Sequence, residues 1–399
     1  MLIGLVGKPS VGKSTFFKAA TLAEVEIASY PFTTIKANHG VGYVKVECLE
    51  KEFNTKCNPA HGFCIDGNRF VPVELMDVAG LVPGASEGKG LGNQFLDDLR
   101  EADVFIHIVD LSGTTDAEGK PLKEGSDYSV VDDVNFLEEE LDKWFLNIFM
   151  KVWKSFARKT EMENLKFSES IANQFSGLKI NEDQVKDVLR ELNLPERPTA
   201  WSENQIKNFV SSLRHKSKPT IIAGNKIDTE KGAANYQLLR DTFPKMIVMP
   251  CSADSELALR EASKAELIDY IPGEKTFSVK KGKSLNEKQK QALDKIKENV
   301  LDKYVEGTGV QQILNNAVLG LLNYIAVFPA SANKLADSKG NILPDCFLMP
   351  QGSTALDFAY KVHKDLGDNF IRAINAKTKQ TVGKEYELKD GDGLEIIAR

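Results

Sequence analysis

The stretch that decides the fold of this chain is Gly7-Lys8-Pro9-Ser10-Val11-Gly12-Lys13-Ser14. It follows the pattern G-x-x-x-x-G-K-[ST], which forms a phosphate-binding loop when a strand precedes it and a helix follows it. The apolar residues 1–6 predict that strand, and residues 14–20 predict the start of that helix. Glycines let the backbone bend, so that successive N–H groups and the positive end of the helix dipole face phosphate oxygens. We therefore predict a P-loop nucleotide-binding domain.

The residues around this loop have distinct expected roles. Lys13 is expected to reach the β- and γ-phosphates, and Ser14 is expected to ligate Mg²⁺ through its hydroxyl. Further contacts with the nucleotide are expected from Lys8, Pro9, Ser10, Val11, Gly12 and Thr15. A second strand, over 70–76, leads into Asp77, which is placed to hold Mg²⁺ through water. Gly80 is expected to donate its N–H to the γ-phosphate, because a side chain there would obstruct close approach.

The nucleotide base is expected to meet Asn225-Lys226-Ile227-Asp228, which follows directly on an apolar strand. The Asp228 carboxylate can accept one hydrogen bond from the ring N–H of guanine and one from its exocyclic amine. Adenine offers an acceptor at the first position and nothing at the second, so a buried site of this kind rejects it by about four orders of magnitude. Further on, Ser252 and Ala253 follow another strand, and the Ala253 N–H is expected to bond the guanine O6.

The order of these elements is that of a G domain, with each functional residue just after a strand. Apolar runs over 104–110, 219–224 and 246–250 predict buried parallel strands. The predicted fold class is α/β: a P-loop G domain with a mostly parallel sheet, an inserted α-helical, coiled-coil-like domain and a C-terminal β-grasp domain.

Three segments resemble the switch regions of the Obg-like GTPases: Tyr30-Pro31-Phe32-Thr33-Thr34, residues 77–85 and residues 88–96. The overall layout is similar to the YchF (Obg-like ATPase) subfamily in its archaeal form. The resemblance implies a switch threonine whose hydroxyl and carbonyl sense Mg²⁺ and the γ-phosphate, and we favour Thr34 over Thr33. The expected catalytic residues are Lys13, Thr34 and Gly80. The expected Mg²⁺ ligands are Ser14, Thr34 and Asp77.

Two positions bear on the rate of hydrolysis. Ras-like enzymes orient the attacking water with a Gln just after the D-x-x-G element, but this chain has Leu81 there, which cannot hydrogen bond through its side chain. Ser10 stands where some relatives carry an Asn that ligates K⁺, and it is a poorer ligand, which argues against K⁺ activation. We therefore expect a slow intrinsic GTPase that awaits a partner.

The chain departs from its better-known relatives at Asp228. Bacterial and eukaryotic YchF relatives usually carry a Glu there, lack the preceding Lys and accept ATP. This chain keeps both Lys226 and Asp228, so its residues favour GTP and GDP although the subfamily name suggests ATP. We predict that GTP binds at least about tenfold more tightly than ATP. An ATPase with the same machinery is the alternative.

Length and composition are those of a soluble globular protein. The chain has 399 residues, 42% hydrophobic and 27% charged, with a net charge of −6. The length predicts two or three domains. The longest apolar stretch, 317–328, is too short to span a bilayer, and no leader precedes the first strand. We expect a cytoplasmic monomer that does not associate with membranes.

Between Asp110 and Asn225 lie 114 residues, where a crossover helix and its loops need about 30. The surplus predicts an inserted helical domain. One expected helix begins at 132, and two further helices are expected over 182–192 and 202–214. Three tryptophans fall in this region, and we favour hairpin packing over a nucleic-acid stacking surface for them: Trp144, Trp153 and Trp201.

The C-terminal region resembles a TGS domain, a ubiquitin-like β-grasp module. The pattern predicts a strand over 343–350, a capped helix over 353–363, and strands over 370–375 and 394–398. The resemblance implies a role that faces the ribosome or ribosomal RNA, by association only. The predicted domains are the G domain over 1–130 and 214–325, the helical domain over 131–213 and the TGS domain over 326–399.

Residues 274–304 contain nine lysines against five acidic residues in an otherwise acidic chain. A mixture of both signs is typical of a solvated surface, and we favour that interpretation. Contact with ribosomal RNA is the alternative.

Five cysteines remain. Cys48, Cys57 and Cys64 lie near His61 in the insertion before Asp77. Zinc could bind at Cys57, His61 and Cys64, with Cys48 as a guessed fourth ligand, but the spacing matches no standard site. We favour reduced structural thiols over a disulfide or a zinc site.

The sequence thus predicts a nucleotide-controlled regulator of translation. GTP is expected to order Thr34 and the segment from Gly80, and hydrolysis is expected to release them. The alternative from another class is an RNA-binding scaffold in which nucleotide turnover is incidental. A metabolic phosphotransferase is disfavoured, because no acceptor-binding lid or second substrate motif is visible.

Overall fold

The computed structural model describes residues 1–21, 38–78, 80, 84, 99–123, 128–195, 197–331, 335–336 and 340–399. Within these residues the largest sheet has seven strands in the order β2-β4-β1-β5-β6-β7, with β3 paired to β4. The strands are β1 (Leu2–Val6), β2 (His39–Glu47), β3 (Phe63–Ile65), β4 (Asn68–Asp77), β5 (Val104–Asp110), β6 (Thr220–Asn225) and β7 (Ile247–Pro250). The predicted α/β class and the mostly parallel sheet are confirmed.

The register of the sheet brings the functional loops to one edge. Strand β1 runs parallel to β4 with Leu5 opposite Asp77, and β5 runs parallel to β6 with Asp110 opposite Asn225. Strand β1 is buried along its whole length, as expected for a central parallel strand covered on both faces. The sequence did not indicate β2, which pairs antiparallel with β4.

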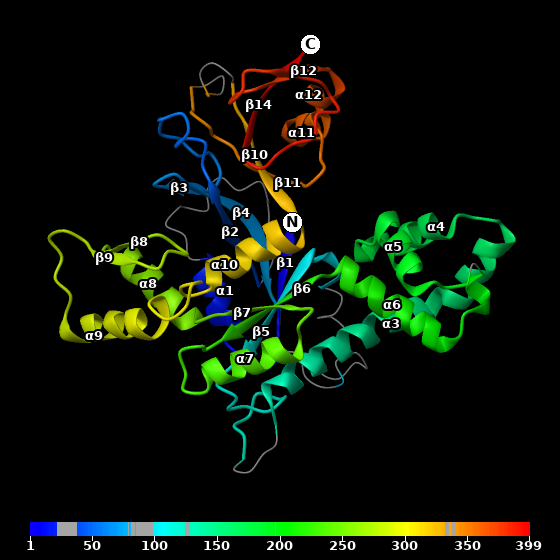
Figure 1. Ribbon diagram of the computed structural model, residues 1–399, viewed down its shortest axis with the longest axis horizontal. Helices are drawn as coiled ribbons and strands as arrows, with labels where there is room; N and C mark the ends of the chain where they lie inside the picture. The colour runs from blue at the N-terminus through cyan, green and yellow to red at the C-terminus, as the bar shows by residue number, and fades with distance from the viewer. Residues whose placement is uncertain are drawn as a thin grey trace.

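Helices cover both faces of this sheet (Figure 1). One face packs against α1 (Lys13–Thr21), α8 (Ala253–Lys264) and α10 (Val310–Asn315), through an apolar cluster that includes Phe16, Val310 and Ile313. The other face packs against the start of α3 (Val130–Met162) and α7 (Gly232–Thr242). Short helical turns complete this part of the chain: η2 (Leu99–Glu101), η5 (Lys297–Leu301) and η6 (Asn316–Leu321).

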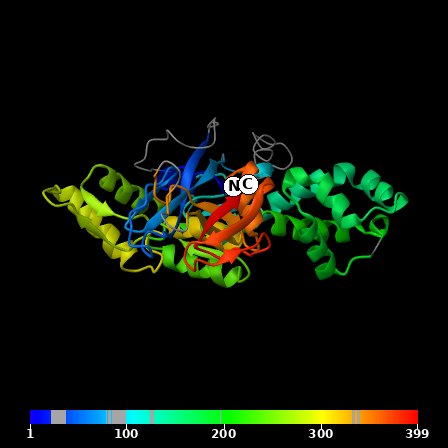
Figure 2. The ribbon, with the colours of Figure 1, turned by 90° about the horizontal axis from the view of Figure 1, so that it is seen from above.

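A helical arm projects from the sheet at one end of the molecule (Figures 1 and 2). It consists of α3, α4 (Phe167–Gln174), η3 (Ser176–Leu178), α5 (Glu182–Leu192), η4 (Pro198–Ala200) and α6 (Glu203–Ser217). A capping box of Ser129 and Asp132 starts α3. The sequence did not indicate α4, and α6 runs four residues past the expected domain boundary at 213/214.

The arm has an aromatic core. The three tryptophans are 5%, 6% and 7% exposed at Trp144, Trp153 and Trp201. Trp153 and Trp201 pack with ring centroids 5.3 Å apart, and Phe149 stacks on Phe175 at 3.8 Å. The tryptophans therefore serve packing, as predicted, and do not form an exposed stacking surface.

The C-terminal domain has a sheet in the order β11-β10-β14-β12-β13 in the described residues. Its elements are β10 (Tyr324–Pro329), β11 (Phe347–Pro350), α11 (Ala355–Val362), α12 (Lys364–Asp368), β12 (Phe370–Asn375), β13 (Thr381–Val382) and β14 (Asp392–Ala398). The apolar run that ends at 328 supplies β10, which pairs parallel with β14. This strand begins two residues before the expected boundary at 326 and was missed in the sequence.

The lysine-rich segment lies at the end of the molecule opposite the arm (Figures 1 and 2). It includes β9 (Phe277–Val279), paired with β8 (Ile268–Tyr270), and α9 (Glu287–Ile296). Leu293 is the buried residue of α9, and its other described residues are exposed or half-buried, which fits the predicted solvated surface. No helix among the described residues is long and apolar enough to cross a membrane.

Candidate functional site

The P-loop connects β1 to α1, and its glycines are required by close contacts. Gly7 has φ +149°, and a Cβ there would lie 2.5 Å from the Ile108 carbonyl oxygen. Gly12 has φ +95°, and a Cβ there would lie 2.3 Å from Asn225 Nδ2. Both contacts are far shorter than any carbon atom tolerates, so the loop can adopt this shape only with glycine at these positions.

The two predicted Mg²⁺ ligands in the described residues lie together. The Ser14 hydroxyl at the start of α1 donates to Asp77 Oδ2 at the end of β4, at 2.9 Å. Oxygen ligands of this kind are those that Mg²⁺ prefers. Thr34 lies outside the described residues, as do Leu81 and residues 88–96.

Lys13 lies inside the loop. Its Nζ donates to the Lys8 carbonyl oxygen at 2.7 Å, and the residue is 7% exposed. Burial lowers the pKa of Lys13 to about 8, although the charge of Asp77 opposes this shift. The ammonium group is therefore held where phosphate oxygens would meet the loop, and its charge depends on pH just above neutrality.

Gly80 lies against the P-loop, but the contact seen is with protein. A Cβ on Gly80 would lie 2.8 Å from the Pro9 backbone nitrogen, and a Cβ on Gly119 would lie 2.8 Å from the Pro9 carbonyl oxygen. The loop after β4 and the loop after β5 thus both approach Pro9 closely. The predicted bond from the Gly80 N–H to a γ-phosphate stays a prediction.

Asn225 joins the phosphate side of the site to its base side. Its Nδ2 donates to the Val11 carbonyl oxygen at 2.9 Å, and its Oδ1 accepts from the Ala253 N–H at 3.0 Å. The residue is 3% exposed, so both bonds are shielded from water. The Ala253 N–H was expected to face guanine O6. It is already used by Asn225, so a bond to O6 would have to share this hydrogen.

Lys226 and Asp228 lie in the same loop as Asn225. Lys226 Nζ lies 2.7 Å from Asp110 Oδ2 and 3.2 Å from the Ser10 carbonyl oxygen, so this side chain lies along the P-loop. The exposed Asp228 accepts a hydrogen bond from Ser252 Oγ at 2.8 Å. The carboxylate is thus oriented by a buried serine and open to a ligand.

The side chain of Lys8 differs from its predicted role. Its Nζ lies 2.9 Å from Asp133 Oδ1 in the first turn of α3 and donates to the Thr115 carbonyl oxygen at 2.7 Å. Lys8 and Asp133 are each 3% exposed, and Tyr128 donates to the same carboxylate. The side chain therefore ties the P-loop to the first turn of α3 and to the loop after β5.

Sequence reasoning missed Asp110, Thr115 and Asp133. Asp110 carried a usable signal, since it ends the strand next to the one that ends in Asn225. Asp133 carried none, because nothing in an acidic helix start distinguishes a carboxylate that caps from one that pairs with a distant lysine. Burial raises the pKa of Asp133, although hydrogen bonds from Tyr128 and Lys8 oppose this.

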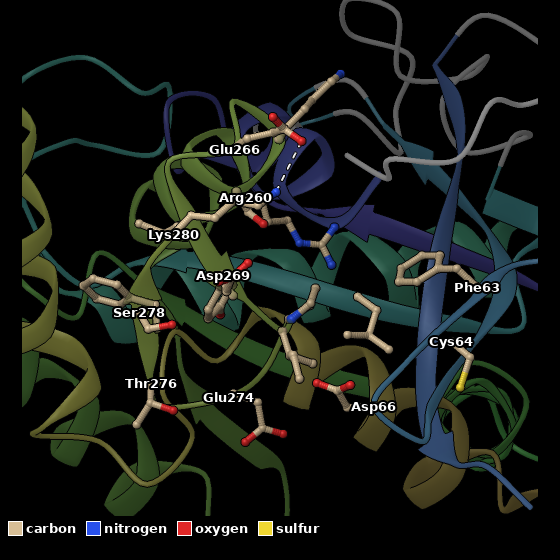
Figure 3. Close-up of a pocket in the computed structure, with 18 residues that line it drawn as sticks. Phe63, Cys64, Asp66, Arg260, Glu266, Asp269, Glu274, Thr276, Ser278 and Lys280 are labelled. Atoms are coloured by element: carbon tan, nitrogen blue, oxygen red, sulfur yellow. Dashed lines mark hydrogen bonds and ion pairs between the residues drawn. The ribbon is translucent and has the colours of Figure 1, made fainter. Parts of the chain in front are cut away.

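A hollow of about 1010 Å³ lies elsewhere, between β3 and the β8–β9 pair (Figure 3). Phe63 and Asp66 line one side. Glu266 and Lys280 line the other, where Lys280 Nζ donates to Glu266 Oε1 at 3.3 Å. Its lining shares no residue with the phosphate or base contacts described above. We therefore place the nucleotide at the P-loop edge of the sheet and assign no ligand to this hollow.

The fold and these contacts define a P-loop NTPase of the GTPase class. Family models match a 50S ribosome-binding GTPase over residues 2–144, an Obg-like GTPase YGR210-like G4 motif-containing domain over 223–331, and a TGS domain over 339–398. The first two matches cover the strands of the seven-stranded sheet apart from the start of β6, and the third covers most of the C-terminal domain.

Full-length relatives give the same assignment. The chain is 48% identical to a GTP-binding protein of Methanocaldococcus jannaschii, covering 100% of this chain and 99% of that protein. A crystal structure of a GTP binding protein from Pyrococcus horikoshii OT3 is 40% identical with a TM-score of 0.79, covering 100% of both chains. A ribosome-binding ATPase YchF of Bacillus subtilis is 27% identical, covering 98% and 96%. This chain belongs to the Obg-like GTPase family, in its YchF branch.

The depressed pKa of Lys13 predicts how nucleotide binding depends on pH. Affinity for Mg²⁺–GTP should fall about tenfold between pH 7 and pH 9, because the amine loses its charge as pH rises through about 8. Titration calorimetry in buffers of different ionisation enthalpy should show proton uptake on binding at pH 9. Lys13→Arg keeps its charge and controls for titration of the base. An identical pH profile in that variant would rule out Lys13 as the cause.

The Lys8–Asp133 pair predicts a large loss of stability on mutation. Asp133→Ala should lower the free energy of unfolding by about 3 kcal/mol, since it leaves a buried ammonium without its carboxylate. Glu139→Ala removes an exposed carboxylate from the same helix and should cost less than about 0.5 kcal/mol. Denaturant unfolding compares the two, and equal losses would contradict the assigned pairing.

Proposed function

We propose that this protein is a GTP-binding, slowly GTP-hydrolysing switch that acts on the ribosome. The observation that carries the choice of nucleotide is the exposed Asp228 carboxylate, oriented by Ser252 beside a loop that Asn225 fixes to the P-loop. A carboxylate in this position can accept from both the ring N–H and the exocyclic amine of guanine. Adenine lacks both donors at these positions, so Asp228 would gain no hydrogen bond from it.

We propose that Lys8 to Thr15 surround the phosphates, with Lys13 as the charged contact. Ser14 and Asp77 would hold Mg²⁺, because their oxygens lie 2.9 Å apart at the mouth of the loop. Mg²⁺ would neutralise charge on the β- and γ-phosphates. Thr34 would complete the ligand set, and Gly80 would donate its N–H to the γ-phosphate. These two roles rest on the resemblance of the switch segments.

We expect slow hydrolysis because of the residue that follows Gly80. Leu81 stands where a Gln would orient water, so the chain's own contribution is to hold the phosphates and their charge in place. Acceleration would then come from a partner that supplies the missing polar group. A switch needs this property, because a fast intrinsic reaction would end the GTP-bound state before a partner is met.

The Lys8–Asp133 pair supports a switch in which the arm responds to the P-loop. The ammonium bonds both the start of α3 and the Thr115 loop, so a change in P-loop conformation would act on the arm directly. Farther along α3, Glu138 and Asp142 pair with the buried Arg214 of α6. We propose that the G domain comprises 1–130 and 214–325, the arm 131–213 and the TGS domain 326–399.

The ribosome is the proposed partner because a match to a 50S ribosome-binding GTPase covers the first third of the chain. The Bacillus subtilis relative is named a ribosome-binding ATPase. That name also keeps an ATPase as the alternative, and the choice depends on Asp228. A ribosomal role would place the protein in the cytoplasm, and the lysine-rich surface around α9 would suit ribosomal RNA.

Substituting Asp228 tests the nucleotide. Wild-type protein should bind Mg²⁺–GTP at least about tenfold more tightly than Mg²⁺–ATP by calorimetry. Asp228→Asn should weaken GTP by roughly 100-fold, because it replaces an acceptor for two donors with a group that accepts one. The variant should gain affinity for xanthosine triphosphate, whose 2-carbonyl can accept from the new amide. Glu230→Gln, an exposed neighbour, should change nothing. Equal wild-type affinities for GTP and ATP would refute a guanine site.

Ribosome co-sedimentation separates the switch from a scaffold. Wild-type protein should pellet with ribosomes in a nucleotide-dependent way, with a difference of at least about fivefold between a non-hydrolysable GTP analogue and GDP. Lys13→Ala should remove this dependence, because it removes the charged phosphate contact. Binding that is equal in all nucleotide states of the wild type would support the scaffold.

A further inference from the structure

A group of three cysteines and one glutamate lies at the tip of the β2–β4 hairpin. The chain leaves β2 at Glu47 and does not rejoin the sheet until Phe63, a connection of 15 residues without regular structure. Loops of this length without regular structure are uncommon in compact domains and are usually functional or disordered. In this loop and β3, the ligand atoms of Cys48, Glu50, Cys57 and Cys64 all lie within 4.8 Å of one another.

Two of the distances within this group match those of a tetrahedral metal site. Cys48 Sγ and Cys57 Sγ are 3.7 Å apart, and Cys64 Sγ is 3.4 Å from Glu50 Oε1. Around zinc, with Zn–S near 2.3 Å and Zn–O near 2.0 Å, tetrahedral geometry places two sulfurs about 3.8 Å apart and a sulfur and an oxygen about 3.5 Å apart. A disulfide would bring two sulfurs to about 2.05 Å, so Cys48 and Cys57 are free thiols at this spacing.

The glutamate is oriented for this role by the backbone. Glu50 Oε2 accepts from the Cys57 N–H at 2.8 Å, which leaves Oε1 directed at the thiols. Ligating carboxylates are usually held in this way by a second hydrogen bond. His61, the residue expected from the sequence, is not part of the group: its Nε2 lies 4.0 Å from Asp345 Oδ1.

A buried cation lies beside the thiols. Cys48 is 1% exposed, and the charge of Arg69 acts on both Cys48 and Cys57. Three thiolates and a carboxylate carry four negative charges, of which a divalent ion cancels two. The guanidinium of Arg69, fully buried beside them, reduces the remainder.

We propose that Cys48, Glu50, Cys57 and Cys64 form a structural zinc site. Thiolates select a soft or borderline ion, a closed tetrahedral set is typical of structural zinc, and four protein ligands leave no position for substrate. This replaces both the expectation of simple reduced thiols and the ligand set with His61.

The site holds a loop on which the C-terminal domain docks. The Asn58 N–H donates to the Ile342 carbonyl oxygen and the Ala60 N–H donates to the Pro344 carbonyl oxygen, both at 2.8 Å. Cys48 and Leu49 belong to one apolar cluster with residues of β10. Figure 1 shows the tip of the hairpin beside β10 and β14. Zinc would therefore fix the surface between the G domain and the TGS domain.

The first test is the metal content of the full chain, purified without a metal-affinity tag and under reducing conditions. We expect about one zinc per chain by mass spectrometry of the elements. Cys57→Ser combined with Cys64→Ser should lose it, and Cys346→Ser, which alters a thiol against the same apolar cluster, should retain it. GTP affinity, measured in parallel, reports that the G domain is folded in each variant.

A matched pair of variants distinguishes the ligand sets. Glu50→Ala should weaken zinc affinity at least about 100-fold, whereas His61→Ala should leave it unchanged. The reverse result would overturn the assignment of Glu50.

A third test uses the wild-type protein alone, so it does not depend on whether a variant folds. A chelator removes bound metal, and the protein is then titrated with Co²⁺. It should develop thiolate-to-cobalt absorption and the intense visible bands of a tetrahedral site, saturating at about one equivalent. Wild type that holds no zinc and gives no such spectrum would overturn the proposal, as would a Cys48–Cys57 disulfide in the purified chain.

Discussion

The structure depends on the buried side chain of Asn225, which accepts from the Ala253 N–H and donates to the Val11 carbonyl. Three loops that follow different strands meet at this one amide, because parallel strands end at the same edge of the sheet. Gly12 has no side chain because the amide occupies that space. The phosphate loop and the base-binding loop are therefore held in a fixed relation before any nucleotide binds, and neither can move without breaking a bond shielded from water.

Buried charge is the second constraint on this molecule. Lys8, Lys13 and Lys226 all surround the P-loop, where uncompensated ammonium groups would repel one another and lose hydration. Lys8 and Lys226 pair with Asp133 and Asp110, which leaves Lys13 to meet phosphate. The pairings also connect separate parts of the chain, since Asp133 belongs to the arm. The P-loop is thus joined directly to the first turn of α3, the helix that continues into the arm.

Much of the fold could be predicted because the parallel strands and three arm helices, α3, α5 and α6, carry clear local apolar patterns. Strand β5 and helix α5 have the bounds that their apolar patterns indicate, and the P-loop motif correctly placed a loop between a strand and a helix. Strand β2 was missed because an edge strand with a half-buried pattern gives a weak signal. Strand β10 was missed because its apolar run continues from the preceding helical turns. Local patterns identify elements, and they identify boundaries less well where two apolar elements follow one another.

The sequence by itself determined the class of the protein, because phosphate binding needs a fixed local spacing of glycine, lysine and serine. It also determined the candidate base-reading residue, Asp228. Only the tertiary structure decided that Lys8 faces Asp133 rather than phosphate, and that Glu50 rather than His61 joins the cysteines. The physical reason is the same in both cases. Partners 125 residues apart in Lys8 and Asp133, or on facing parts of an irregular loop, meet only after the sheet has fixed where each segment ends.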